Sequence, residues 1–250
     1  MKGTFFLKPL EFNIDIFGES FEQGQILKGN MALKKHGPVE GTLSNYGVTL
    51  AIGDNKKIKK KDVKAFITID SKEFSQSEEI EDQQSLEFSF QLDANCPITT
   101  KASSLYLLCG PRDDLLSAGA LELNIIPNRW LQEFIDTLVL FFRFKLKAIK
   151  SKKDLVEYKL QAPDTKEFGA IEQLLLSLRK DGDNIQVFYQ FKVKKLCYEQ
   201  EGVVAKDEII KIEQSLTPKD YKQFGDSPNQ NQMKLFLNEA LEQIKRKTLL

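Results

Sequence analysis

The 250-residue sequence is poor in the side chains from which most active sites are built. It contains one histidine, three cysteines and one tryptophan. Histidine titrates near neutral pH and is the commonest metal ligand, so its scarcity disfavours both metal sites and acid–base catalysis. The one histidine, His36, lies in a Lys-His-Gly-Pro turn sequence, where we expect a solvated loop residue. The sequence therefore predicts no catalytic residue, no metal site and no cofactor, and we expect a protein that is not an enzyme.

The cysteines are scattered and form no Cys-x-x-Cys pair. Cys96, Cys109 and Cys197 thus indicate neither a disulfide framework nor a zinc ribbon. Cys109 lies in an apolar alternation and is expected to fill the core. Unpaired cysteines are typical of a reducing compartment, which predicts a cytoplasmic protein.

The sequence also lacks long apolar runs and a net charge. The longest apolar run, Leu138–Phe142, is a fraction of the roughly 20 residues that a membrane-spanning helix needs. Met1–Pro9 has too short an apolar stretch for a signal peptide. Lysine and arginine total 36 against 36 aspartates and glutamates, and only five residues are arginine. A nucleic-acid partner is therefore disfavoured.

An alternation of apolar and polar residues dominates the first half of the chain. It is clear from Leu10 to Ile16 and again from Leu86 to Leu92, and turn residues separate the segments. About seven short strands at this spacing predict an antiparallel β-sandwich over residues 1–127. Three further segments between turns are expected to be strands: Gln25–Lys34, Leu43–Ile52 and Val63–Ile69.

The pattern changes after Pro127. Apolar residues at helical spacing predict a connecting helix over residues 128–142, with Asn128 as its N-cap. Alternation then returns and predicts a second, smaller β-sandwich over 143–216. Leu174–Leu178 also suits a helix, but a strand is favoured because an Asp-Gly turn follows. Residues 217–250 are expected to form a linker and a C-terminal amphipathic helix.

Lysine is concentrated in one place. Six lysines follow the Gly53-Asp54-Asn55 sequence within nine residues: Lys56, Lys57, Lys59, Lys60, Lys61 and Lys64. A hairpin tip of this kind is a candidate contact for anionic lipid, for an acidic segment of a partner protein or for nucleic acid. The favoured interpretation is an edge whose lysines only keep the protein soluble. The acidic stretch Glu73–Asp82 is expected to offset part of this charge.

Several short segments resemble the bacterial and archaeal sporulation-control family, whose members have an arrestin-like fold of two β-sandwich domains. Phe17–Gly29 is similar to the opening of arrestin-like N-domains. Leu92–Thr99 is similar to the family's Pro-hydrophobic-Thr step. Leu121–Pro127 with the helix after it, and Val156–Pro163, resemble later segments of the family.

Two departures leave open a more distant arrestin relative, such as one nearer the retromer arrestin-like subunit. The end of the strand at Phe191–Lys195 lacks the expected Glu-Val-Asp-Arg-Arg pattern, and Gly37-Pro38 replaces paired glycines. The resemblance implies no catalytic residue. It implies adaptor or regulatory work on protein partners, through sheet edges and loops.

The leading hypothesis is therefore a non-enzymatic arrestin-like adaptor or scaffold that binds protein partners. One variant of this hypothesis places the protein near a membrane. The alternative is a carrier that holds an apolar ligand or lipid between its sheets or beneath the helix at 130–142. The 18 phenylalanines would allow such a cavity, but they fit an ordinary packed core at least as well.

Overall fold

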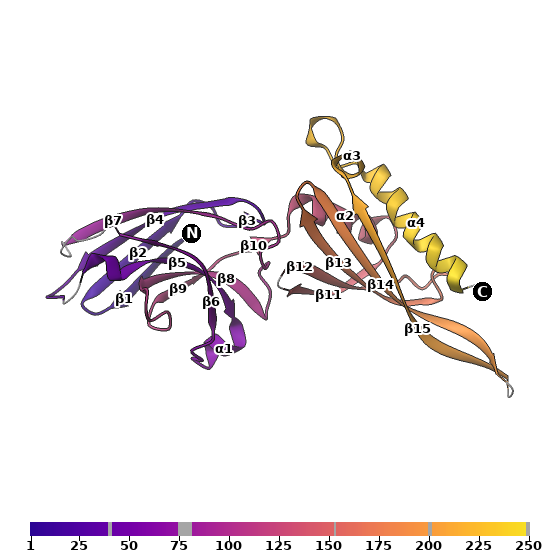
Figure 1. The fold of residues 1–250 in the computed structure, drawn as a ribbon, viewed down its shortest axis with the longest axis horizontal. Coiled ribbons are helices and arrows are strands. Elements are labelled where there is room, and N and C mark those ends of the chain that lie inside the picture. Colours follow the sequence, from indigo (N-terminus) through magenta and orange to yellow (C-terminus); the bar gives the residue numbers. More distant parts are fainter. Residues whose placement is uncertain (40–41, 75–81, 153, 200–201, 249–250) are drawn as a thin grey trace. The chain divides into compact units, whose positions relative to one another are not determined.

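Alternating apolar residues in the first part of the chain form two antiparallel sheets whose buried sides meet (Figure 1). The structure is a computed structural model, and it describes residues 1–39, 42–74, 82–152, 154–199 and 202–248. The chain divides into two units, Met1–Ile126 and Pro127–Leu250. The division falls where the sequence pattern changes from alternation to helical spacing.

The first unit is a β-sandwich. One sheet has the order β1-β2-β4-β7 and consists of β1 (Lys2–Leu7), β2 (Leu10–Ile16), β4 (Ile26–Lys35) and β7 (Gln83–Gln91). The other has the order β6-β5-β8-β9 and consists of β6 (Phe66–Glu73), β5 (Tyr46–Asp54), β8 (Ser103–Pro111) and β9 (Gly119–Glu122). A parallel pair, β3 (Phe21–Glu22) with β10 (Ile125–Ile126), joins the beginning and the end of the unit.

The core of the first unit consists of the apolar residues that the alternation predicted to be buried. Every second residue of β2, from Leu10 to Ile16, is buried. Phe12 of β2 meets Tyr46 of β5 across the sandwich, with 5.8 Å between ring centroids. Cys109 of β8 is fully buried, as predicted. Hydrophobic burial on the facing sides of the sheets thus holds this unit together.

The second unit differs from the expected second sandwich over residues 143–216. Its five strands form one sheet of order β11-β12-β13-β14-β15. They are β11 (Lys145–Lys152), β12 (Leu155–Gln161), β13 (Ile171–Asp181), β14 (Asn184–Glu199) and β15 (Gly202–Leu216). Two helices, α2 (Arg129–Leu140) and α4 (Gln230–Thr248), pack together, and α4 lies against β14 (Figure 1). The sheet's apolar side is therefore covered by helices where a second sheet was expected.

Both predicted helices of the second unit are confirmed. Asn128 caps α2, because its side chain accepts a hydrogen bond from the backbone N–H of Trp130 at 3.1 Å. Leu174–Leu178 lies within β13, which confirms the strand interpretation. Between β15 and α4, the expected linker contains the short helix α3 (Pro218–Tyr221) and a 3₁₀ turn at Phe224–Asp226.

Two details of the first unit differ from the sequence expectations. The strand expected from Leu43 begins at Tyr46, after a 3₁₀ turn over Leu43–Asn45. The strand expected from Val63 begins at Phe66, and the short helix α1 (Asn55–Lys59) fills part of the connection from β5. The predicted hairpin connection thus exists, since β5 and β6 are antiparallel neighbours, but Gly53-Asp54-Asn55 is the end of β5 and the start of a helix.

Candidate functional site

The six predicted contact lysines lie between β5 and β6, at the tip that α1 forms in Figure 1. We call residues 56–64 the lysine segment. Lys57 is half-buried and the other five lysines are exposed. Asp54 begins α1 by accepting hydrogen bonds from the backbone N–H groups of Lys56 and Lys57 at 2.9 and 3.2 Å. The structure therefore brings all six lysines together on one short connection.

A small apolar cluster holds the base of the lysine segment on the outer side of its sheet. Ile58 and Phe66 pack against Tyr106 and its neighbours in β5 and β8. The hydroxyl of Tyr106 donates to Asn55 Oδ1 at 2.9 Å. Gly53 permits this packing, because a Cβ there would lie 2.5 Å from the Tyr106 ring. The segment is thus fixed to the sheet at its base, and its lysines extend from that base.

The acids next to the lysines are engaged with the backbone. Asp54 caps α1, and Asp62 accepts a hydrogen bond from the backbone N–H of Lys64 at 2.9 Å. In the part of the chain that the structure describes, none of the six lysines takes part in an ion pair. Their positive charges are therefore left to solvent or to a binding partner.

Three exposed residues close to the lysine segment in the sequence or across the sheet were not identified as site residues from the sequence. Val63 is 80% exposed and Ile67 is 65% exposed. Lys101 belongs to the loop before β8, and the next residue accepts a hydrogen bond from the backbone N–H of Asn55 at 3.0 Å. Lys101 is far from the segment in the sequence, so only the pairing of β5 with β8 could have placed it there.

The expected neutralisation by Glu73–Asp82 falls largely on residues 75–81, which lie outside the described residues. Glu73 itself ends β6, whereas the lysine segment precedes its start. A strand rises about 3.3 Å per residue, so Glu73 is roughly 23 Å from Phe66 along β6. Glu73 also pairs with Arg112. It therefore does little to screen the lysines at the other end.

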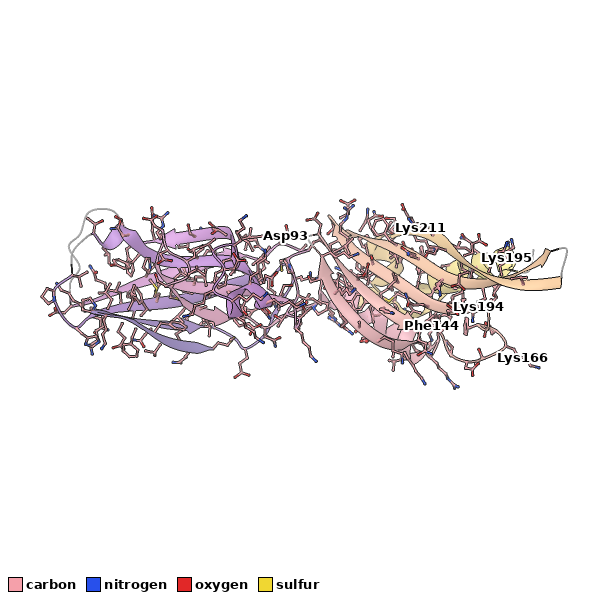
Figure 2. The ribbon with its side chains drawn as sticks, turned by 90° about the horizontal axis from the view of Figure 1, so that it is seen from below. Asp93, Phe144, Lys166, Lys194, Lys195 and Lys211 are labelled. Atoms are coloured by element: carbon pink, nitrogen blue, oxygen red, sulfur yellow. The ribbon has the colours of Figure 1, made fainter. Side chains whose placement is uncertain are left out.

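A second candidate surface is the outer edge of β15 in the second unit. β15 is the last strand of its sheet and pairs with β14 over 15 residue pairs without a register shift. β13 follows β14 only as far as Val193, so the β14–β15 hairpin continues alone beyond that point. Lys194, Lys195 and Lys211 mark these two strands in Figure 2.

The direction of the backbone donors on this edge follows from one hydrogen bond. The N–H of Lys194 donates to the carbonyl of Ala170 at 2.8 Å, away from β15. The pair Lys194–Asp207 is therefore a non-hydrogen-bonded pair, and such pairs alternate along an antiparallel ladder. Lys192–Ile209 is the next of this kind. The N–H groups of Asp207 and Ile209 thus point to the open side of β15.

The opposite edge of the same sheet is protected. β11 carries four lysines in eight residues, and its register with β12 shifts between Leu146 and Ala148. Lysines and bulges are features that prevent edge-to-edge pairing. β15 has charges of both signs but no proline and no register shift. The two edges of the sheet therefore differ in their readiness to accept another strand.

A network of ion pairs lies at the base of the projecting hairpin. Lys192 contacts Glu172 and Asp207, each at 2.7 Å, and Lys194 contacts Glu172 at 2.8 Å. Hydrogen bonds from Lys192 and Lys194 lower the pKa of Glu172 to about 2. All four groups are at least partly exposed, so the network orients side chains more than it stabilises the fold.

Among the described side chains, the two cysteines and the histidine are not arranged for catalysis. Burial raises the pKa of the Cys109 thiol and, with a contribution from Asp93, that of Cys96 to about 12, so both thiols stay protonated. The side chain of Cys197 lies outside the described residues. His36, about half exposed, is hydrogen-bonded to Glu11 at 2.6 Å. Within the described ranges, no group of three His, Cys, Asp or Glu side chains could hold a metal ion.

The helices and the surface hollows bear on membrane crossing and on ligand carrying. None of the helices in the described ranges combines the length and the apolar character that crossing a membrane requires. The hollows that we find lie over outward-facing sheet residues, for instance one of about 220 Å³ bordered by Ser177, Phe188 and Glu213. These hollows give the carrier alternative no support.

Comparisons with known proteins bear on the fold. No family model matches the sequence, and no curated protein matches it. Among solved structures, the sporulation control protein Spo0M from Bacillus subtilis matches with a TM-score of 0.66 at 12% sequence identity, over 95% of this chain and 99% of that chain. The fold expected from the resemblance is thereby confirmed: the chain is mainly β and shares the fold of the sporulation control protein Spo0M.

Proposed function

We propose that the chain is a non-enzymatic regulatory adaptor of the cytoplasm that binds an extended segment of a partner protein at the edge of β15. The fold that it shares with a sporulation control protein supports a regulatory role. The observation that carries the binding mode is the contrast between the two edges of the second sheet: β11 is bulged and rich in lysine, while β15 is long and regular.

Strand addition suits the chemistry of this edge. The outward N–H groups of Asp207 and Ile209 would donate to carbonyls of the added segment, and backbone hydrogen bonds of this kind give affinity. The Ile209 side chain, 58% exposed, and the charges of Lys211 and Glu213 would give selectivity through alternate side chains of the partner. The cytoplasmic part of the proposal is supported by Cys96 and Cys109, which are both free thiols.

The test separates the backbone of the edge from its side chains. Ile209→Pro removes one outward donor and leaves the hydrogen bonds to β14 in place, since Ile209 belongs to a non-hydrogen-bonded pair. Ile209→Ala keeps the donor and removes most of the side chain. Each tagged protein is cross-linked in its host and the captured partners are quantified, with the unfolding midpoint as the control for folding.

A partner that is retained by Ile209→Ala and lost by Ile209→Pro would support strand addition at β15. Capture of the same proteins by the wild type and both variants would refute it. A wild-type dimer in size-exclusion chromatography that Ile209→Pro converts to a monomer would assign the edge to self-pairing, and the adaptor proposal would fall.

A further inference from the structure

We propose that the lysine segment, together with Val63 and Ile67, binds the surface of a membrane that contains anionic phospholipid. This inference is independent of the proposed adaptor function, because it concerns the first unit and the β15 edge belongs to the second.

The first support is uncompensated charge. Six lysines and two aspartates give residues 54–64 a net charge of +4. Both aspartate side chains accept backbone hydrogen bonds, and within the described residues the six lysines have no ion-pair partner. Exposed Lys101 adds a further charge beside α1. Clusters of this size attract the anionic headgroups of a membrane leaflet.

The second support is exposed apolar surface within the lysine segment and on the strand that follows it. Val63 lies between Asp62 and Lys64 and is 80% exposed, and Ile67 on the following strand is 65% exposed. In contrast, Ile58 of the same connection packs against Tyr106. Val63, exposed within the lysine segment, matches the membrane interface, where an apolar tip enters below the headgroups while basic residues contact them. Ile67 faces the other side of β6 from Phe66 and extends the exposed apolar surface along the strand that follows the segment.

The third support is rigid presentation. The cap at Asp54, the hydrogen bond from Tyr106 to Asn55 and the packing of Ile58 fix the base of the segment. Because the base is already ordered, binding loses less conformational entropy than a flexible tail would.

A membrane fits this surface better than a nucleic acid does. Residues 56–64 contain no arginine and no aromatic residue. Arginine reads bases and aromatic rings stack on them, whereas lysine acts as a point charge toward phosphate or carboxylate. Exposed Val63 and Ile67 would add nothing to contacts with a phosphodiester backbone.

The experiment is sedimentation of the full chain with vesicles of phosphatidylcholine, alone or with about a third phosphatidylserine, at about 0.1 M salt. We expect binding only to the anionic vesicles. Lys59→Glu/Lys60→Glu should weaken it at least about 25-fold, from about 5-fold for each lysine lost. The matched control, Lys145→Glu/Lys147→Glu on β11, makes the same change in net charge and should leave binding within about 3-fold.

A second variant tests the apolar part. Val63→Ser/Ile67→Ser keeps every charge, and we expect it to weaken vesicle binding and to make the remaining binding more sensitive to salt. All four positions of the two test variants are exposed, so folding should be retained, which thermal unfolding checks.

Three results would overturn the proposal. They are absence of binding to anionic vesicles, an equal loss with the β11 control, and tighter binding to a short DNA duplex that Val63→Ser/Ile67→Ser does not weaken. Ile209→Pro should leave vesicle binding unchanged, so failure here and failure of the adaptor proposal are separate outcomes.

Discussion

Replacing a buried tyrosine of the second unit by phenylalanine removes its hydroxyl oxygen. At two of three positions this should raise the stability of the unit, and at the third it should lower it. Tyr158 and Tyr189 are buried, and their hydroxyls have no hydrogen-bond partner among the described residues. Tyr221 is equally buried, but its hydroxyl donates to the carbonyl of Asp183 at 2.5 Å and accepts from Lys180 Nζ at 3.2 Å. Tyr→Phe therefore removes an unsatisfied group at two positions and a satisfied one at the third.

The magnitudes follow from desolvation. A buried polar group without a partner costs about 1 to 3 kcal/mol, because the unfolded chain hydrogen-bonds it to water. Tyr189→Phe, and separately Tyr158→Phe, should thus stabilise the second unit by about 1 kcal/mol, the low end of that range. Tyr221→Phe removes one of the two donors to the Asp183 carbonyl, which then keeps only the 2.9 Å hydrogen bond from Lys180 Nζ, and should destabilise the unit by about 1 to 2 kcal/mol.

The single tryptophan, Trp130, lies in α2, so its fluorescence reports on the second unit. Urea unfolding followed at this signal should move its midpoint up by about 0.5 M for Tyr189→Phe, given a slope of about 2 kcal/mol/M that stays constant. Tyr221→Phe should move it down. If Tyr189→Phe destabilised the unit as much as Tyr221→Phe, its hydroxyl would have a bonded partner in solution and the reasoning would be refuted.

Two other predictions concern the base of the lysine segment and the ion-pair network. Gly53→Ala places a Cβ against the Tyr106 ring and should destabilise the first unit by about 1 to 3 kcal/mol; hydrogen exchange should then quicken in α1, and unchanged exchange would contradict the packing. Glu172 has a lowered pKa, so its contribution to stability is present above about pH 4.5 and is lost as pH falls toward 2. Carbon-13 NMR of its carboxyl should show a midpoint well below 4.5, the ordinary pKa of a glutamate, while a midpoint above 4 would contradict the network.

Much of the fold was accessible from the sequence because burial has a period. The alternation from Leu10 to Ile16 and the helical spacing after Asn128 each reflect one buried side, and both elements appear where the pattern places them. The sequence pattern did not predict that helices cover the second sheet, since a sheet alternates in the same way whether helices or strands cover it. That choice depends on where α4 docks, and local pattern does not encode docking.

The candidate site was predicted in part. Adjacent lysines reveal a basic segment directly, whereas the exposure of Val63 depends on β6 beginning at Phe66. The open edge of β15 was inaccessible for a similar reason: a strand becomes an edge through the order of the sheet, which is a property of the whole unit.

The unequal edges of the second sheet also set the valency of the unit. If β15 accepts a partner strand as proposed, the sheet accepts it on one side only, because β11 is bulged and rich in lysine. A sheet open on both sides could act as a link in a chain of molecules and grow into a filament. The proposed mode instead lets the second unit end such a chain without extending it, and complexes formed only through this sheet would then stay finite in size.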